Sequence, residues 1–373
     1  AKQIGDAKAN LGMTVTDEER EDALRNQVAK LCKEIDLDQS TALKFLNFLF
    51  NESVKVQSDS KQTHLSVFLK AKALEEEGKK IIHLEVGEPD FKPPKEVKTA
   101  LAEVYDKGYG KYGHVKGITE LRTAWAHHTN QLENDDYDEE NIMVCPGARF
   151  AVYLAITTLL NPGDEIIVIE PAWPAYKECA LNAGIKVRTI KTTLETKWEP
   201  SVEQINNAIN ENTKMIVLNY PNNPTGKILP QKLLDDIVQT AKEHDLYVLS
   251  DEIYDEYSND DWRSVSIYGY EKSIITMSFS KSYAMTGYRI GYAIAEPSII
   301  DKMSKLQALS LTNVSEPIQY VALQAIGGQT HRKQKFVDIV NSRLKALVKI
   351  AKDIGLEFIE PDGAMYLFAK TKH

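Results

Sequence analysis

The pattern of apolar and polar residues changes once along the chain, near residue 80. Before that point, apolar residues recur every three or four positions, as in Leu24, Val28, Leu31 and Ile35, which is typical of amphipathic helices. After it, short apolar runs alternate with segments of helical pattern. The pattern therefore predicts an all-helical region over residues 1–57, followed by a region of alternating strands and helices.

Seven apolar runs in the second region have the length and composition of buried β-strands. Each spans a few residues, is rich in Ile and Val, and is bounded by turn signals. The predicted strands cover residues 142–145, 165–170, 186–190, 215–220, 246–250, 273–279 and 289–295. Because helical segments separate most of them, we expect a largely parallel sheet that helices cover on both faces. The remaining predictions, all beyond residue 297, are helices over 302–329 and 331–354 and a strand over 364–369.

The composition is that of an ordinary globular protein, and it excludes several classes of function. Of the 373 residues, 43% are hydrophobic and 27% are charged, and the net charge of −9 disfavours binding to a nucleic-acid backbone. No apolar run approaches the roughly 18 residues of a membrane span, and no signal peptide opens the sequence. Three widely spaced cysteines indicate neither a disulfide framework nor a zinc site. We therefore expect a cytoplasmic protein without a nucleic-acid partner, a membrane contact or a metal.

A glycine motif, Gly108-Tyr-Gly110-Lys-Tyr-Gly113, matches the dinucleotide-binding pattern G-x-G-x-x-G. That pattern binds a pyrophosphate because it follows a strand and opens a helix. Here it follows a segment of helical pattern, Val97 to Lys107, so a nicotinamide cofactor is not indicated. A plain glycine-rich turn, or a role for one of its tyrosines, accounts for the motif better.

The strongest candidate for chemistry is Lys281, which comes directly after the predicted strand 273–279. Hydroxyl side chains lie on either side of it, and Arg289 follows eight residues later. Open α/β sheets bind their ligands at the carboxyl ends of strands, and hydroxyls with a guanidinium can hold a phosphate. A buried lysine near other cations has a lowered pKa and can attack a carbonyl. Taken alone, such a lysine is more often solvated.

Two further polar motifs follow the preceding strands. Asn222-Asn-Pro-Thr-Gly226 comes after one strand, and Ser250-Asp-Glu-Ile-Tyr254 comes after the next. Each is weak alone, since the first is often a turn and the second a helix cap. Because all three motifs follow successive strands of one predicted sheet, we expect them at the same edge.

Together, these motifs resemble those of the class I aminotransferases, which are pyridoxal 5′-phosphate (PLP) enzymes of fold type I. The resemblance covers residues 65–370 and implies an aminotransferase domain over 65–373, after a linker over 58–64. The implied fold is α/β, with a mostly parallel seven-stranded sheet in a large domain and a smaller α/β domain. An all-α N-terminal domain over 1–57 precedes it.

The resemblance implies a role in cofactor binding for each matching residue. Lys281 matches the lysine that forms the Schiff base and moves the proton at the substrate α-carbon. Asp251 matches the carboxylate paired with the pyridine nitrogen, which keeps the ring protonated as an electron acceptor. Asn223 and Tyr254 match the donors to the 3-oxygen, and Trp173 matches the aromatic that stacks on the ring. The residues that match the phosphate site are Gly147, Ala148, Ser278, Ser280, Arg289 and, reaching over from the other subunit of a homodimer, Tyr112.

The residues implied to bind substrate are Gly87, Asn223 and Arg149. Arg149 matches a position where some relatives carry a lysine that meets an acidic side chain, which favours dicarboxylic substrates, although a solvated arginine is an equal alternative. In the family, an arginine well beyond the stretch matching Gly363-Ala-Met-Tyr366 clamps the substrate α-carboxylate. The sequence stops at His373 without it. We therefore expect the sequence to be part of a longer chain.

A second resemblance covers residues 1–57, which match the all-helical chorismate mutases in order and spacing, without that family's first helix. These enzymes rearrange chorismate to prephenate by holding the substrate in its reactive conformation. The resemblance implies that Lys8 and Gln57 flank the ether oxygen, that Arg20 binds a carboxylate and that Glu21 binds the hydroxyl. Ser53 shares a helix face with Gln57. A packing arm is the plain alternative, and a DNA-binding arm is disfavoured because the segment has no basic face.

We therefore expect a bifunctional enzyme of aromatic amino-acid biosynthesis. The PLP domain would transaminate prephenate or an aromatic 2-oxo acid, with glutamate or aspartate as amino donor. The alternative is an aminotransferase of broader specificity, or another PLP reaction such as a lyase, joined to a non-catalytic ligand-sensing domain.

Overall fold

In the computed structural model, the described residues are 18–34, 64–84, 86–133, 136–258, 261–327 and 330–371, together with 39, 42, 43, 46, 47 and 50. The chain divides into two units, Ala1–Gly87 and Glu88–His373, and each is described by itself. Three residues of the predicted mutase site, Lys8, Ser53 and Gln57, lie outside the described residues.

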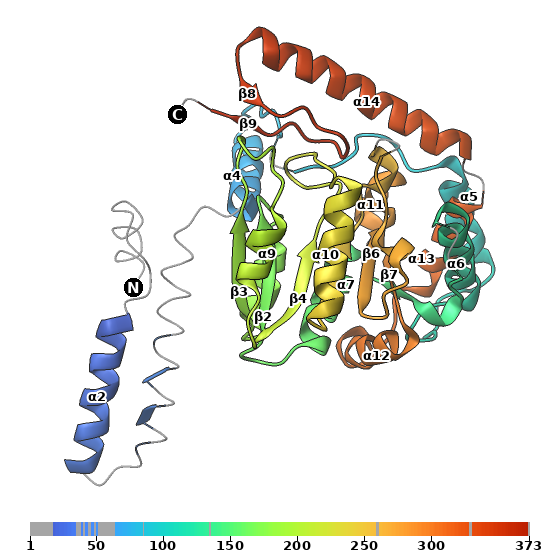
Figure 1. The fold of residues 1–373 in the computed structure, drawn as a ribbon. Helices are drawn as coiled ribbons and strands as arrows, with labels where there is room; N and C mark the ends of the chain where they lie inside the picture. The colour runs from blue at the N-terminus through green and yellow to red at the C-terminus, as the bar shows by residue number, and fades with distance from the viewer. Residues whose placement is uncertain are drawn as a thin grey trace. The chain divides into compact units, whose positions relative to one another are not determined.

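The described part of the first unit is mainly helical, as predicted for residues 1–57, and it includes a second helix that lies beyond that range. Helix α2 covers Glu18–Glu34 and helix α4 covers His64–Glu76 (Figure 1). Lys33 lies in the last turn of α2, where its positive charge suits the negative end of the helix dipole. The predicted mutase-site residues Arg20 and Glu21 both lie on α2.

The second unit is built on a seven-stranded sheet whose strands lie where the apolar runs predict them. The strands are β1 (Ile142–Cys145), β2 (Glu165–Glu170), β3 (Lys186–Lys191), β4 (Thr213–Leu218), β5 (Tyr247–Asp251), β6 (Ser273–Ser278) and β7 (Gly291–Ala295). Their order across the sheet is β1-β7-β6-β5-β4-β2-β3. Figure 1 labels β3, β2, β4, β6 and β7, which follow one another in this order across the picture. β7 runs antiparallel to β1 and β6, whereas all the other neighbours are parallel. The prediction of a largely parallel sheet is therefore confirmed.

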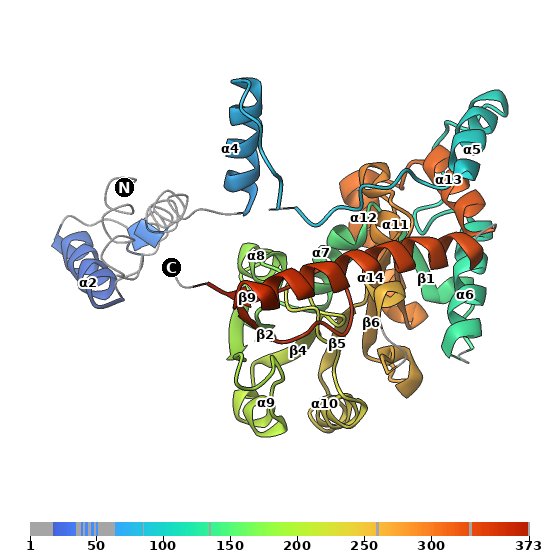
Figure 2. The ribbon, with the colours of Figure 1, turned by 90° about the horizontal axis from the view of Figure 1, so that it is seen from above.

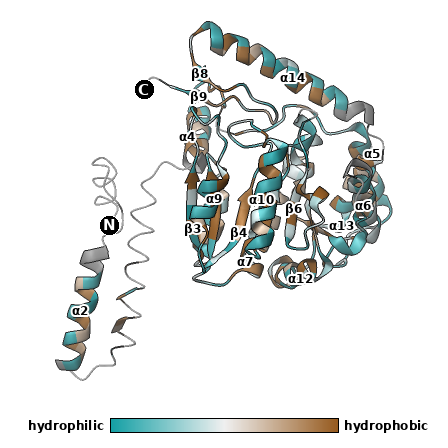
Figure 3. Cartoon of the chain, in the orientation of Figure 1, coloured by the Kyte–Doolittle hydropathy of each residue, from teal (hydrophilic) through white to brown (hydrophobic). Residues whose placement is uncertain are grey.

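Helices cover both faces of this sheet because alternate residues of its strands point to opposite faces. Ile166 and Val168 of β2 belong to one apolar core, whereas Ile167 and Ile169 of the same strand belong to another. The first core includes α7 (Ala148–Leu159), α8 (Ala175–Asn182) and α12 (Pro297–Leu311), and the second includes α9 (Val202–Ala208) and α10 (Gln231–Glu243). Figure 2 shows α9 and α10 on one side of the sheet and α7 and α8 on the other. The strands are mainly apolar in colour, while α9 and α10 turn hydrophilic residues outward (Figure 3).

Further helices complete this unit. A third core joins the β1 and β7 end of the sheet to α5 (Lys95–Asp106), α6 (Thr119–Glu133) and α13 (Glu316–Ile326). The four-residue helix α11 (Phe279–Ser282) follows β6, and the long helix α14 (Thr330–Asp353) leads to a small antiparallel pair, β8 (Glu357–Phe358) and β9 (Ala369–Lys370). Within the described residues, no helix is long and apolar enough to cross a membrane.

Two predicted elements of this last region differ from the structure. The helix predicted over 302–329 is broken, because Thr312 takes a left-handed backbone conformation (φ 66°) that ends α12. α13 then begins with Pro317 in its first turn, which favours a new helix start. The strand predicted over 364–369 contributes only its last residue to β9. Before it, the backbone N–H groups of Asp362 and Gly363 donate to the carbonyl of Gly226, 2.8 and 2.9 Å away, instead of to a neighbouring strand.

Candidate active site

The three polar motifs that follow β4, β5 and β6 lie at one edge of the sheet. These strands are neighbours and parallel, so their carboxyl ends meet at the same edge. Asn219 joins two of the motifs: its amide donates to the carbonyl of Asp251 (2.9 Å) and its oxygen accepts from the backbone N–H of Asn223 (3.0 Å). The structure thus brings together the segments that carry Asn223, Asp251 and Lys281.

Asp251 is a buried carboxylate at the end of β5, with 1% of its surface exposed. Its Oδ2 accepts a hydrogen bond from the hydroxyl of Tyr176 (2.6 Å). Among the residues that the structure describes, its other oxygen, Oδ1, has no hydrogen-bond partner. Burial raises the pKa of Asp251 to about 6, against the lowering effects of Tyr176, Thr276, the Ile253 backbone and the charge of Lys281. Such a carboxylate is suited to a ligand that donates an N–H to it.

Lys281 lies on α11, directly after β6, as the sequence predicts. Its ammonium nitrogen is 5.9 Å from the centre of the Tyr254 ring, and its carbonyl accepts a hydrogen bond from the Tyr257 hydroxyl (3.0 Å). Burial lowers the pKa of Lys281, while the charges of Glu88 and Asp251 raise it. The surroundings therefore favour the neutral amine more than water does, and a neutral amine is the form that attacks a carbonyl.

Tyr254 and Tyr366 form a pair of hydroxyls at this edge. Their oxygens are 2.5 Å apart, and their rings meet edge to face at 5.4 Å. Burial raises the pKa of Tyr254 well above its usual value, and the neighbouring Tyr366 adds to the effect, so the hydroxyl keeps its proton. The side chain of Asn223 also reaches Tyr254 and lowers this pKa.

A cradle for an anion lies where β1 and β7 meet. Gly147 precedes α7 without a capping side chain, so the N-terminus of that helix is open to a negatively charged group. Arg289, whose backbone is left-handed (φ 53°), donates to the carbonyls of Pro146 (3.2 Å) and Thr286 (2.7 Å). A Cβ on Gly147 would come within 2.6 Å of the Arg289 guanidinium, so only glycine allows this approach.

Two serines complete the cradle. The hydroxyl of Ser278 donates to that of Ser280 (2.8 Å) and accepts from the backbone N–H of Ser280 (3.0 Å). Guanidinium, hydroxyls and a helix N-terminus are the groups that bind phosphate.

Gly291, at the start of β7, allows the backbones around this cradle to approach one another closely. A Cβ there would lie 2.6 Å from the carbonyl oxygen of Met277 and 2.9 Å from the backbone nitrogen of Ala148. We expect Gly291→Ala to lower the free energy of unfolding by roughly 1–3 kcal/mol, since the backbones cannot give way cheaply. Urea denaturation measures this, with Gly287→Ala as control, because among the described residues nothing lies within 4 Å of a Cβ there. Equal urea midpoints for the two variants would contradict the expectation.

The remaining predicted site residues differ in how far they are buried and in which unit they lie. Trp173 is partly buried, and the Arg149 guanidinium lies 4.6 Å from the centre of its ring. Tyr112 is 89% exposed in the single chain. Gly87 belongs to the first unit, so its role at the substrate stays a prediction. The helix α5 precedes the glycine motif at Gly108, as expected for a motif that does not bind a dinucleotide.

Three functional candidates were not predicted from the sequence. Tyr176 holds Asp251, Asn219 links two motifs, and Tyr366 pairs with Tyr254. Tyr176 lies in the first turn of α8, three residues after Trp173, and this proximity in the sequence was the available signal. Tyr366 is 112 residues from its partner and gave no local signal.

These residues fit a planar, phosphorylated aldehyde cofactor with a ring nitrogen. The unpartnered Oδ1 of Asp251 would accept from the ring nitrogen, the cradle around Gly147 and Arg289 would hold the phosphate, and Lys281 would bond to the aldehyde. In the part of the chain that the structure describes, no group of three His, Cys, Asp or Glu side chains is placed to hold a metal ion.

Comparisons with known proteins point to the same chemistry. Residues 79–373 match the family model of class I and II aminotransferases, and residues 1–58 match that of type II chorismate mutases. The aspartate aminotransferase of Thermotoga maritima is 34% identical over 81% of this chain and 80% of its own length. The aspartate/prephenate aminotransferase of Thermus thermophilus is 33% identical over 86% and 84%. The crystal structure of the Thermotoga maritima aspartate aminotransferase superposes with a TM-score of 0.81, at 33% identity, over 85% of this chain and 84% of that one.

Proposed function

The chain belongs to the class I and II aminotransferases, and we propose that it uses PLP to transfer an amino group from aspartate or glutamate to prephenate or an aromatic 2-oxo acid. The observation that carries the cofactor assignment is Asp251. A buried carboxylate with one unpartnered oxygen is costly unless a ligand supplies a donor, and a protonated pyridine nitrogen is such a donor.

The proposed work of the chain is to hold the cofactor and to move one proton. When bound, the cofactor's protonated ring accepts the electrons released at the substrate α-carbon. Asp251, held by Tyr176, keeps the proton on the ring nitrogen. Lys281 takes the proton from the α-carbon and returns it to the cofactor side, a transfer for which its lowered pKa suits it.

We also assign the remaining contacts of the cofactor. Asn223 and Tyr254 would donate to the 3-oxygen, and Trp173 would stack on the ring. Gly147, Ala148, Ser278, Ser280 and Arg289 would bind the phosphate. Tyr112 would reach the phosphate of a second copy in a homodimer, a proposal that its exposure in the single chain supports.

The preference for dicarboxylic substrates rests on Arg149. Arg149 is exposed, and its guanidinium lies against the Trp173 ring, the side chain that we assign to the cofactor. We infer that its charge can reach the substrate bound to that cofactor. A guanidinium binds a carboxylate through two parallel hydrogen bonds, which suits the side-chain carboxylate of aspartate or glutamate, or the second carboxylate of prephenate. The name of the Thermus thermophilus relative, aspartate/prephenate aminotransferase, agrees with this choice. Gly87 and Asn223 remain the proposed contacts of the α-carboxylate.

The segment matched to type II chorismate mutases extends the proposal to two consecutive reactions. The first domain, over residues 1–57 with a linker to residue 64, would convert chorismate to prephenate. Lys8, Arg20, Glu21, Ser53 and Gln57 are its proposed site residues. The second domain would then transaminate prephenate.

We expect the full-length protein, given chorismate, glutamate and PLP, to form arogenate. Mass spectrometry of the products tests this, and two variants separate the steps. Arg20→Ala should stop prephenate formation, and Lys281→Ala should let prephenate accumulate without amino transfer. Transamination of aspartate without any turnover of chorismate would contradict the two-reaction proposal, and unaltered chorismate turnover in Arg20→Ala would favour a sensing role for the first domain.

A further inference from the structure

The hydroxyl of Tyr254 has a neighbour that the cofactor assignment does not use. Tyr366 comes from the far end of the chain, yet its oxygen lies 2.5 Å from that of Tyr254. Tyr254 is 1% exposed, and Tyr366 is partly buried. At this distance one hydroxyl must donate to the other.

The segment that carries Tyr366, residues 361–366, is fixed to the loop that carries Asn223. We call this segment the strap. The backbone N–H groups of Asp362 and Gly363 donate to the carbonyl of Gly226, and the side chain of Asp362 forms an ion pair with Lys227. The contact is close: a Cβ on Gly226 would lie 2.5 Å from Pro361 Cβ and 3.0 Å from the Tyr366 carbonyl.

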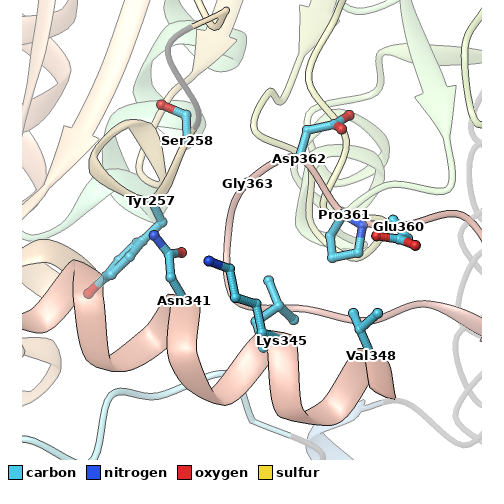
Figure 4. Close-up of a pocket in the computed structure, with 10 residues that line it drawn as sticks. Tyr257, Ser258, Asn341, Lys345, Val348, Glu360, Pro361, Asp362 and Gly363 are labelled. Atoms are coloured by element: carbon cyan, nitrogen blue, oxygen red, sulfur yellow. The ribbon is translucent and has the colours of Figure 1, made fainter. Parts of the chain in front are cut away.

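The other side of the strap borders a cavity of about 280 Å³, which Asp251 and Lys281 do not line. Figure 4 shows Pro361, Asp362 and Gly363 facing Asn341, Lys345 and Val348 of α14 across this space, with Tyr257 and Ser258 beside it. The strap is therefore hydrogen-bonded to Gly226 on one side, while Gly363 packs closely against Tyr257 and Ser258 beside the cavity. These contacts set where the Tyr366 hydroxyl lies.

We propose that Tyr366 is a positioning residue for the transamination, which donates a hydrogen bond to the Tyr254 hydroxyl and fixes it for donation to the 3-oxygen of the cofactor. This inference rests on the proposed function. It extends the proposed site to a residue outside the three strand-end motifs.

The hydrogen count of the two hydroxyls supports this direction of donation. Tyr254 has one hydrogen, and if the cofactor receives it, only the lone pairs of Tyr254 remain for Tyr366. Tyr366 must then be the donor. This reverses the direction without a cofactor, in which Tyr254 donates to Tyr366: besides burial, which raises both pKa values, the hydrogen bond raises the pKa of Tyr254 and lowers that of Tyr366. A hydroxyl that accepts one hydrogen bond becomes a stronger donor in the next, so Tyr366 strengthens the bond that Tyr254 makes.

The test is a pH titration of the visible absorbance of the PLP-loaded protein. A hydrogen bond to the 3-oxygen stabilises the deprotonated form of the bound cofactor, so a weaker bond makes the proton dissociate less readily. We expect Tyr366→Phe to lower the dissociation constant of that proton roughly three- to tenfold, in the same direction as Tyr254→Phe but by less. The control is Tyr247→Phe, because Tyr247 is a partly buried tyrosine at the opposite end of β5 from Asp251. The cofactor absorbance of this variant should titrate like that of the unmodified protein.

The outcomes separate this inference from the proposed function. If Tyr254→Phe shifts the titration while Tyr366→Phe matches the unmodified protein, the positioning role is wrong and the cofactor assignment stands. If the unmodified protein develops no visible absorbance with PLP, the proposed function itself fails. The affinity of the cofactor-free protein for PLP gives a second readout, which should weaken in Tyr366→Phe and stay unchanged in Tyr247→Phe.

Discussion

Replacing Lys281 with alanine is expected to leave a folded protein that binds PLP without a covalent bond and transaminates roughly a thousandfold more slowly. The loss is expected to be large because, in the proposed function, one side chain would supply both the amine that bonds to the cofactor and the base that moves the proton. The fold should persist because the variant removes an ammonium group that is unfavourable when buried, as its lowered pKa indicates. Reduction with borohydride, followed by denaturation and mass spectrometry, measures covalent attachment directly.

Lys345→Ala is the matched control for this experiment. Lys345 lies on α14, lines the cavity behind the strap and is placed outside the proposed site. This variant should keep the cofactor attached after reduction. A Lys281→Ala protein that still carries reduced cofactor would show that another lysine forms the bond.

Replacing Asp251 with asparagine is expected to change activity and stability in opposite directions. Turnover should fall about a hundred- to a thousandfold, because the amide cannot hold a proton on the pyridine nitrogen, and this factor corresponds to about 3–4 kcal/mol of lost transition-state stabilisation. The cofactor-free protein should instead become more stable above pH 6. Asparagine keeps an oxygen for the Tyr176 hydroxyl and removes a charge that burial disfavours.

The pH dependence of this gain follows from the raised pKa. The Asp251 pKa is about 6 in the folded chain and 3.8 in its usual state, so between these values the folded protein holds a proton that the unfolded chain has lost. The stability of the unmodified, cofactor-free protein therefore falls as the pH rises from about 4 to about 6. Above about pH 6 the full cost of burying the ionised Asp251 lowers the free energy of unfolding, by at most about 3 kcal/mol.

Urea denaturation of the cofactor-free proteins at pH 4 and pH 8 measures the effect. The Asp251→Asn variant should exceed the unmodified protein in stability at pH 8, and this advantage should shrink at pH 4. Asp353→Asn, at an exposed carboxylate at the end of α14, should show no such change. An Asp251→Asn variant that is less stable than the unmodified protein at pH 8 would contradict the expectation.

The sheet could be predicted from the sequence because burial on both faces leaves a strong local signal. In β2, all of Ile166, Ile167, Val168 and Ile169 are buried, so the strand appears as a continuous apolar run between polar turns. Parallel strands also place their ends at one edge, which is why three separate motifs could be expected to meet there. The break at Thr312 was missed because a left-handed threonine depends on its surroundings and not on its helix propensity.

The supporting residues of the site could not be predicted in the same way. Tyr366 lies in a segment whose apolar residues predict a strand, and its real partner is set by two backbone hydrogen bonds to Gly226. Asn219 occupies the residue just after β4, where an amide has no distinctive spacing. Such contacts depend on the path of the whole chain, so they are seen only when the sheet is assembled.

The pairing of β1 with β7 decides when during synthesis the anion cradle can exist. Cys145 pairs with Gly291, so the ribosome must complete the intervening chain before β1 gains this neighbour. At bacterial or eukaryotic rates of translation this takes on the order of ten seconds. Throughout that interval Gly147 lacks Arg289, so a nascent chain has only half of the cradle. If the cradle binds the phosphate of PLP as proposed, PLP can bind it fully only after β7 has been synthesised. Added PLP should then stabilise completed chains and not nascent ones.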